Sequence, residues 1–200
     1  MATVLLTTRF GDEGGLVLTD IYLIIWLFPI IFMLHDFEEI IFIKPWFAKN
    51  RGRLAGRFPK LSARMWAHAD SLSTSSLAFG IAWMFLLVSV VTVTAYLTGW
   101  YYLWFGLLLL FTLHLIIHCI PGLVLKSYAP ALVTSILLLP FCCYLIASFL
   151  QVFPVDVRQA ALYTVIGSII AAVNLTFVHK AMPLLEKWLV SAQHNNRVSQ

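Results

Sequence analysis

Residues 21–43 read IYLIIWLFPIIFMLHDFEEIIFI, a run that is apolar at almost every position and long enough to cross a bilayer as a helix. The exception is a group of four ionisable side chains within five residues: His35, Asp36, Glu38 and Glu39. A charged side chain near the middle of a membrane helix costs roughly 2.5–3.5 kcal/mol on insertion scales. The group therefore predicts a functional site whose partner residues lie elsewhere in the chain.

The composition as a whole predicts an integral membrane protein. Of the 200 residues, 61% are hydrophobic and 11% are charged, whereas soluble chains carry about 25% charged residues. We expect one multi-pass membrane domain over residues 1–200, in a membrane such as the plasma membrane of a bacterial-type cell. The net charge of +4 comes almost entirely from one loop, so it bears on topology and predicts no nucleic-acid partner. The lipid bilayer is the expected partner, and the oligomeric state stays open.

Five apolar stretches reach the length of about 20 residues that a transmembrane helix needs. We therefore expect an all-α fold, a bundle of five transmembrane helices at residues 21–43, 75–97, 101–120, 130–150 and 159–180.

The loops between these helices predict how the bundle is oriented. The loop at residues 44–74 has seven Lys and Arg residues and no acidic residue between positions 44 and 64. By the positive-inside rule, this loop is cytoplasmic. Asp12, Glu13 and Asp20 place the N-terminus outside. Five crossings then return the C-terminus to the cytoplasm.

Three of the expected helices carry rare polar residues at similar depth. The third helix carries His114 and His118, and the fifth carries Asn174 and His179. Counting about 1.5 Å per residue from the inner end of each helix, Glu39 lies about 7 Å in, His118 about 12 Å and Asn174 about 9 Å. These depths predict one shared site in the cytoplasmic half of the bilayer.

The spacing within each helix indicates which side chains face that site. Glu38 and Glu39 follow His35 by three and four residues, so the three share one helical face. Asp36 turns about 100° away, and we expect it to pair elsewhere. His114 and His118 are also four residues apart, which lets one helix offer two imidazoles to a single ion.

Imidazole and carboxylate together favour a divalent metal ion, Zn or Fe. The expected metal ligands are drawn from five residues: His35, Glu39, His114, His118 and His179. The expected catalytic residues are Glu38, Glu39 and Asn174. One of the adjacent glutamates would be a ligand, and the other would be the general base that activates a metal-bound water. Asn174 would position the substrate.

The leading hypothesis is a metal-dependent membrane enzyme, of hydrolase or oxidoreductase type, that acts on a lipid or another amphiphile. A proton or metal-ion transporter is a first alternative, but it needs polar residues through the whole bilayer. The outer halves of the five helices carry almost none. A metal-free acid/base enzyme of isomerase type is a second alternative, because two adjacent carboxylates can hold a proton between them.

The His35-x-x-Glu38-Glu39 motif on a first membrane helix, with the later histidines, resembles the HXXEE family of small integral membrane proteins. The segment of residues 128–134, YAPALVT, is similar to that family's Tyr-x-Pro-Gly-x-x-Thr segment, with Ala131 in place of the glycine. The resemblance covers about residues 21–179 and implies a membrane bundle, but it implies no activity. Tyr128 and Thr134 could line the site, although Ser and Thr in membrane helices more often serve packing.

Overall fold

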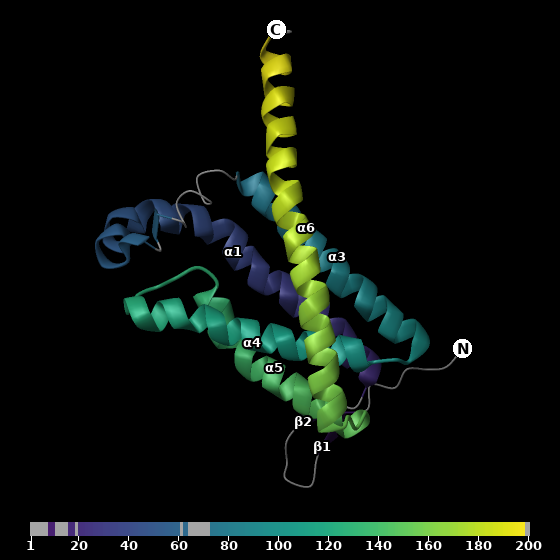
Figure 1. The fold of residues 1–200 in the computed structure, drawn as a ribbon. Coiled ribbons are helices and arrows are strands. Elements are labelled where there is room, and N and C mark those ends of the chain that lie inside the picture. Colours follow the sequence, from purple (N-terminus) through teal and green to yellow (C-terminus); the bar gives the residue numbers. More distant parts are fainter. Residues whose placement is uncertain (1–7, 11–15, 19, 61, 64–72, 199–200) are drawn as a thin grey trace.

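Five long helices form the computed structural model of the chain, and Figure 1 shows their arrangement. The structure describes residues 8–10, 16–18, 20–60, 62–63 and 73–198. The helices are α1 (Ile21–Arg57), α3 (Thr74–Thr98), α4 (Tyr102–Leu125), α5 (Leu132–Val152) and α6 (Val157–Val198). All five are long and apolar enough to cross a membrane. The predicted helical bundle is confirmed to that extent.

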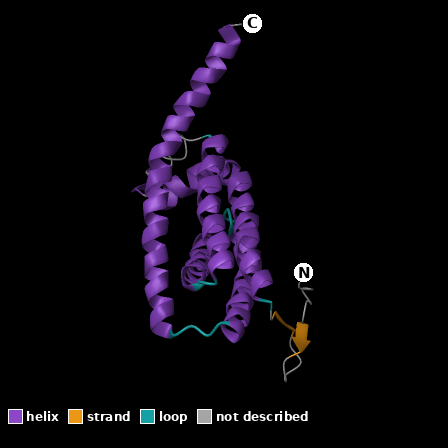
Figure 2. Cartoon of the chain, turned by 90° about the vertical axis from the view of Figure 1, so that its right-hand side faces the viewer, coloured by secondary structure: helices purple, strands orange, loops and turns teal. Residues whose placement is uncertain are grey.

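A short β-hairpin precedes the first helix, and the sequence did not predict it. Strands β1 (Thr8–Phe10) and β2 (Leu16–Leu18) pair antiparallel, and Figure 2 shows them beside one end of the bundle. Asp20 then caps α1, because its Oδ1 accepts a hydrogen bond of 2.9 Å from the backbone N–H of Tyr22.

Two helices run further than the apolar spans predict. α1 continues to Arg57, so residues 44–57 of the expected cytoplasmic loop are helical. Pro45 is the only proline in that extension. A proline removes one backbone hydrogen bond of a helix, and α1 continues past it. α6 likewise continues to Val198 and projects beyond the other helices in Figure 1. The thickness of a bilayer sets the length of the apolar part of a helix, but it does not limit how far the helix continues in polar sequence.

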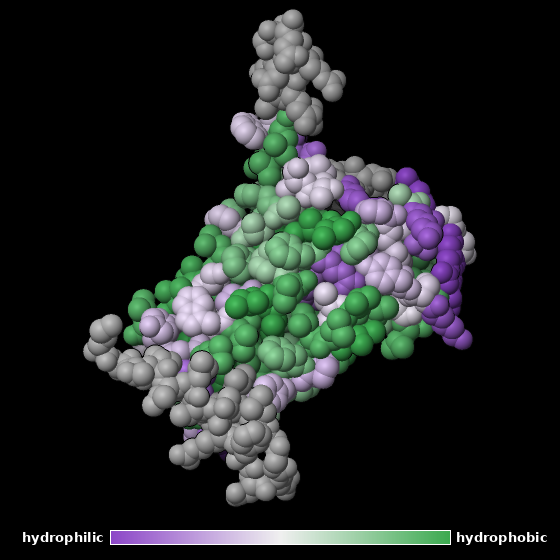
Figure 3. Space-filling model, turned by 180° about the vertical axis from the view of Figure 1, so that it is seen from behind, coloured by the Kyte–Doolittle hydropathy of each residue, from purple (hydrophilic) through white to green (hydrophobic). Residues whose placement is uncertain are grey.

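The helices form a ring in which neighbours pack in the order α1, α3, α6, α4 and α5, and α5 closes the ring against α1. The C-terminal ends of α1 and α4 lie at the same end of the bundle. We call it the basic end, because α1 carries the exposed Lys49, Arg51, Arg53 and Arg57 there. Figure 3 shows hydrophilic side chains gathered at one end of the molecule, while apolar ones cover most of the remaining face.

The half of the bundle away from the basic end holds a dense aromatic core. Phe28, Trp104 and Phe149 are at most 1% exposed, and the Trp104 indole donates a hydrogen bond of 3.2 Å to the carbonyl of Ile25. Phe111 continues this core toward the basic end, where its ring lies 5.6 Å from that of His35. The polar residues of α1 therefore begin where the aromatic core stops.

Candidate metal centre

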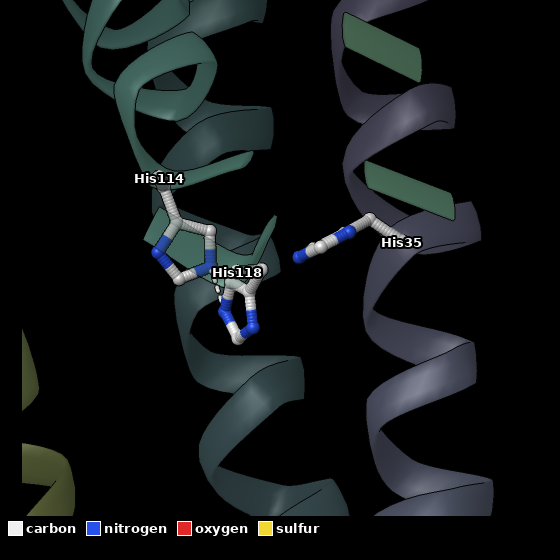
Figure 4. A group of neighbouring side chains, drawn as sticks. All are labelled: His35, His114 and His118. Atoms are coloured by element: carbon white, nitrogen blue, oxygen red, sulfur yellow. Dashed lines mark hydrogen bonds between the residues drawn. The ribbon is translucent and has the colours of Figure 1, made fainter. Parts of the chain in front are cut away.

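Three histidines from two helices meet between α1 and α4. Figure 4 shows the ring of His35 reaching from α1 toward those of His114 and His118 on α4. One ring nitrogen of each lies within 4.8 Å of the other two. The Nε2 atoms of His114 and His118 are 2.9 Å apart, and His35 is fully buried. We call these three residues the histidine group.

A hydrogen-bond chain fixes the tautomer of His35. The hydroxyl of Thr134 donates to the Glu38 carboxylate at 2.6 Å, and a hydroxyl has only one hydrogen to give. Thr134 Oγ1 must therefore accept from His35 Nδ1, which lies 3.1 Å away. With its hydrogen on Nδ1, His35 presents the Nε2 lone pair.

That lone pair lacks a protein partner. His35 Nε2 is buried and has no hydrogen-bond partner among the described residues. A buried polar atom without a partner is rare and points to a water or an ion. Metal-binding histidines commonly hold their other ring N–H in a hydrogen bond, which orients the ring and sets its tautomer. His35 shows this arrangement.

The pair on α4 has a matching arrangement. Two neutral imidazoles that face each other through Nε2 share one hydrogen, and a cation can take its place between the two nitrogens. Nitrogens bound to one tetrahedral zinc ion lie roughly 3.3 Å apart, given Zn–N bonds of about 2.0–2.1 Å. The ring nitrogens here are 2.9 Å apart in the α4 pair and within 4.8 Å over the whole group, so the rings would have to shift to bind one ion.

Glu38 serves as the missing cap of α5. The N-cap position of that helix is Ala131, whose side chain has no acceptor. Glu38 instead reaches across from α1, where Oε1 accepts from the Val133 N–H at 3.2 Å and Oε2 accepts from the Thr134 N–H at 2.7 Å. A carboxylate at a helix N-terminus satisfies free N–H groups and suits the helix dipole.

Tyr128 completes this clamp from the loop before α5. Its hydroxyl donates to Glu38 Oε1 at 2.9 Å. Burial and the hydrogen bond to Glu38 raise the pKa of Tyr128 above its ordinary value, so the hydroxyl remains a donor. The carboxylate of Glu38 therefore binds α5 and its preceding loop, and it is not part of the histidine group.

A cavity of about 820 Å³ lies on the other side of this part of α1, lined by residues of α1, α3, α4 and α6. Its walls are mainly apolar. Its polar lining consists of Asp36, Glu39, Lys44, His114, Ser168 and His179. His114 thus belongs both to the histidine group and to the cavity wall.

The motif is divided differently from our expectation. We expected Glu38 and Glu39 to face one pocket and Asp36 to turn away. The structure turns Glu38 toward α5 and places Asp36 with Glu39 on the cavity wall. Asp36 and Glu39 are three residues apart, so they also share a helical face. Helical spacing alone does not say which face meets which neighbour.

The remaining predicted residues lie outside the histidine group. Glu39 and His179 line the cavity, and neither belongs to the group of three. Asn174 lies on α6 and is not among the residues that line the cavity. Its buried Oδ1 has no hydrogen-bond partner among the described residues. Whether these three residues bind a metal or a substrate stays a prediction.

Comparison with known families shows which family the chain belongs to. A family model described as a protein of unknown function with HXXEE motif matches residues 26–145. The chain belongs to the HXXEE family. The match covers both motifs that meet at Glu38 and the whole histidine group, whereas Asn174 and His179 lie beyond it. The resemblance predicted from the sequence is therefore confirmed.

No curated protein and no solved structure matches the chain significantly. The sequence suggested Tyr128 and Thr134 only as possible lining residues, and it missed that both bind Glu38. The sequence at the start of α5 could have revealed this role. No side chain that can cap a helix stands at position 131, so the free N–H groups there needed an acceptor other than a local side chain.

Proposed function

We propose that this HXXEE protein is a metal-dependent membrane enzyme in which His35, His114 and His118 hold a divalent ion, Zn or Fe. One observation carries the proposal. The Glu38–Thr134 chain fixes the tautomer of His35, so that its buried, unpartnered Nε2 lone pair faces two further imidazoles. A purely structural histidine would use both of its ring nitrogens in hydrogen bonds.

The cavity beside the histidine group supports a lipid or another amphiphile as the substrate. An ion held by His35, His114 and His118 would supply Lewis-acid chemistry toward a substrate oxygen. His114 joins the histidine group to the cavity wall. Glu39 is then the carboxylate placed to accept or return a proton on the cavity side, since Glu38 is engaged with α5.

We further propose that the basic end faces the cytoplasm of a bacterial-type cell and that the N-terminus lies outside. The exposed Lys49, Arg51, Arg53 and Arg57 at one end of the bundle support this orientation. Asp12 and Glu13, on which the expectation for the N-terminus also rests, lie outside the described residues. Labelling of single cysteines introduced at positions 52 and 99 of a variant without its three native cysteines, in intact cells, tests the orientation.

Metal analysis of the purified protein tests the proposed centre. Protein reconstituted with Zn²⁺ or Fe²⁺ and then freed of loosely bound ions is expected to keep about one ion per chain. His118→Ala should lose it, whereas His179→Ala should retain it because His179 lies outside the histidine group. Folded wild-type protein that retains neither ion would overturn the proposal.

A chelator separates this proposal from a metal-free acid/base enzyme. Once a substrate is in hand, removal of the ion should abolish turnover by the metal-dependent enzyme, and adding the ion back should restore it. An enzyme that relied on Asp36 and Glu39 alone would keep its rate after the ion is removed.

A further inference from the structure

We propose that the cavity binds a single-chain amphiphile with a protonated amine in its head group, held between Asp36 and Glu39, with its chain along the apolar wall. This inference rests on the proposed function, because it names the substrate class of the same site. The size of the cavity, the burial of Asp36 beside Glu39 on its wall and the path of α6 each support it.

The cavity has the size and shape for one chain. Its volume of about 820 Å³ lies within the range of roughly 300–1,000 Å³ that is typical of small-molecule sites. The lining runs along α1 from Phe28 to Phe47, a rise of about 28 Å at 1.5 Å per residue. An elongated apolar space suits an extended hydrocarbon chain better than a compact ring system.

The two carboxylates favour a positively charged ligand in the cavity. Asp36 is only 5% exposed, and no group in the described part of the chain donates a hydrogen bond to it. Glu39 lies three residues further along the same wall. A buried carboxylate is costly unless a cation or hydrogen-bond donors compensate it. A ligand ammonium supplies both, whereas a phosphate or sulfate at this position would add to the negative charge.

Lys44 and His179 also line the cavity, and they mark its polar end. Lys44 lies five residues beyond Glu39 along α1, toward the basic end. Phe28 and Phe32 lie in the opposite direction. The amine would therefore lie near the middle of the cavity, beside His114, and the chain would extend toward the aromatic core.

The path of α6 provides a lateral entrance. Away from the basic end, α6 contacts α4 closely, at Gly106 and Tyr163. Nearer the basic end it contacts α3 instead, where Val178 lies against Gly80. α6 thus departs from α4 along the bundle, as Figure 1 shows.

Side chains on both helices mark this entrance. Leu113 and Ile117 of α4 and Leu175 of α6 line the cavity, and yet they are 46–60% exposed. An amphiphile can enter here from the bilayer without crossing water.

Native mass spectrometry of the full chain in phosphatidylcholine nanodiscs tests the inference, with hexadecylamine and hexadecyl sulfate as probes. We expect a one-to-one adduct with the amine at a concentration at least ten-fold lower than with the sulfate. Combined substitution of Asp36→Asn and Glu39→Gln should remove this preference. Asp156→Asn, which changes an exposed carboxyl, is the matched control and should keep it.

A second variant keeps the test decisive if the double substitution does not fold. Ala172→Trp adds a large side chain to a wall residue that is exposed on α6, so it should block amine binding while both carboxylates remain. Equal binding of the amine and the sulfate, or unchanged amine binding in Ala172→Trp, would overturn the inference.

Metal content separates failure of this inference from failure of the proposed function. His118→Ala should lose the ion and still bind the amine, because His118 does not line the cavity. If the wild-type protein binds the amine but no ion, the proposed metal centre is wrong and the proposed ligand class still stands. A wild-type protein that binds the ion but does not prefer the amine would refute only the substrate class.

Discussion

The carboxylate of Glu38 on α1 accepts two hydrogen bonds from Thr134 on α5, one from its backbone N–H at 2.7 Å and one from its hydroxyl at 2.6 Å. The two residues are 96 positions apart in the chain. This contact joins the two motifs that the resemblance to the HXXEE family rests on. Because the same hydroxyl accepts from His35, the contact that caps α5 also orients the first histidine of the proposed metal centre.

Substitution of Glu38 should destabilise the bundle strongly. Glu38→Ala leaves the N–H groups of Val133 and Thr134 and the Tyr128 hydroxyl without their acceptor, and one unsatisfied buried donor costs about 1–3 kcal/mol. Water reaches part of this site, so we expect the free energy of unfolding to fall by about 3 kcal/mol. Denaturant unfolding in mild detergent measures it, and Gln151→Ala, at an exposed position of α5, is the surface control. A loss below 1 kcal/mol would contradict the clamp.

Thr134 should govern metal affinity without changing a ligand. Thr134→Val keeps the backbone N–H that binds Glu38 but removes the acceptor for His35 Nδ1–H. Loss of such an outer hydrogen bond typically lowers metal affinity about 10–100-fold. Thr134→Ser retains the hydroxyl and should bind metal like the wild type. Titration against a chromophoric chelator compares the two. Equal affinities would show that the orientation of His35 does not depend on this hydroxyl.

The histidine group could be predicted from the sequence because helix geometry converts sequence spacing into position. His114 and His118 had to share a face, and the depths of the third and first helices placed them opposite His35. The structure brings these three together. Asn174 has a similar depth and His179 lies about 7.5 Å nearer the inner end, but depth does not tell how a helix is rotated or where it departs from its neighbour.

The division of the acidic residues could not be predicted, because it depends on which helix lies beside each face of α1. Successive residues turn by about 100°, so a cluster of four polar residues points in more than one direction. The uncapped start of α5 lies next to Glu38. The cavity lies next to Asp36 and Glu39. Only the packed bundle determines this arrangement.

Ala131 is expected to tolerate glycine better than other buried alanines do. Its φ is 66°, a left-handed conformation that costs a residue with a side chain about 1–2 kcal/mol. Glycine removes that cost, and this offsets the lost methyl burial and the added freedom of the unfolded chain, each about 0.4–1 kcal/mol. We therefore expect Ala131→Gly to change the free energy of unfolding by less than about 0.5 kcal/mol.

Ala95 is the matched control for this prediction. It is 1% exposed and lies within α3, where a glycine loses both methyl burial and helix propensity. Ala95→Gly should therefore cost about 1.5 kcal/mol. The same unfolding assay measures both variants. Equal losses at the two positions would show that the left-handed backbone at Ala131 carries no cost.

Gly106 should be intolerant of even one added carbon. A Cβ at this position would meet the backbone carbonyl of Tyr163 and would lie 2.8 Å from the backbone nitrogen of Thr164, both on α6. Backbone cannot move aside as a side chain can, so α4 and α6 must separate at the contact from which α6 departs toward α3. Overpacking of this kind typically costs about 1–3 kcal/mol, and we expect Gly106→Ala to lower the free energy of unfolding by that amount.

Gly52 in α1 provides the opposite case. A Cβ there meets nothing within 4 Å, so Gly52→Ala gains helix propensity without a clash and should raise the free energy of unfolding by about 0.5–1 kcal/mol. The two substitutions are chemically identical, and they differ only in what the methyl group meets. Opposite signs in one assay would show that close approach of α4 and α6 stabilises the bundle. A neutral Gly106→Ala would mean that these helices already lie further apart, and the lateral entrance between them would then extend along the whole cavity.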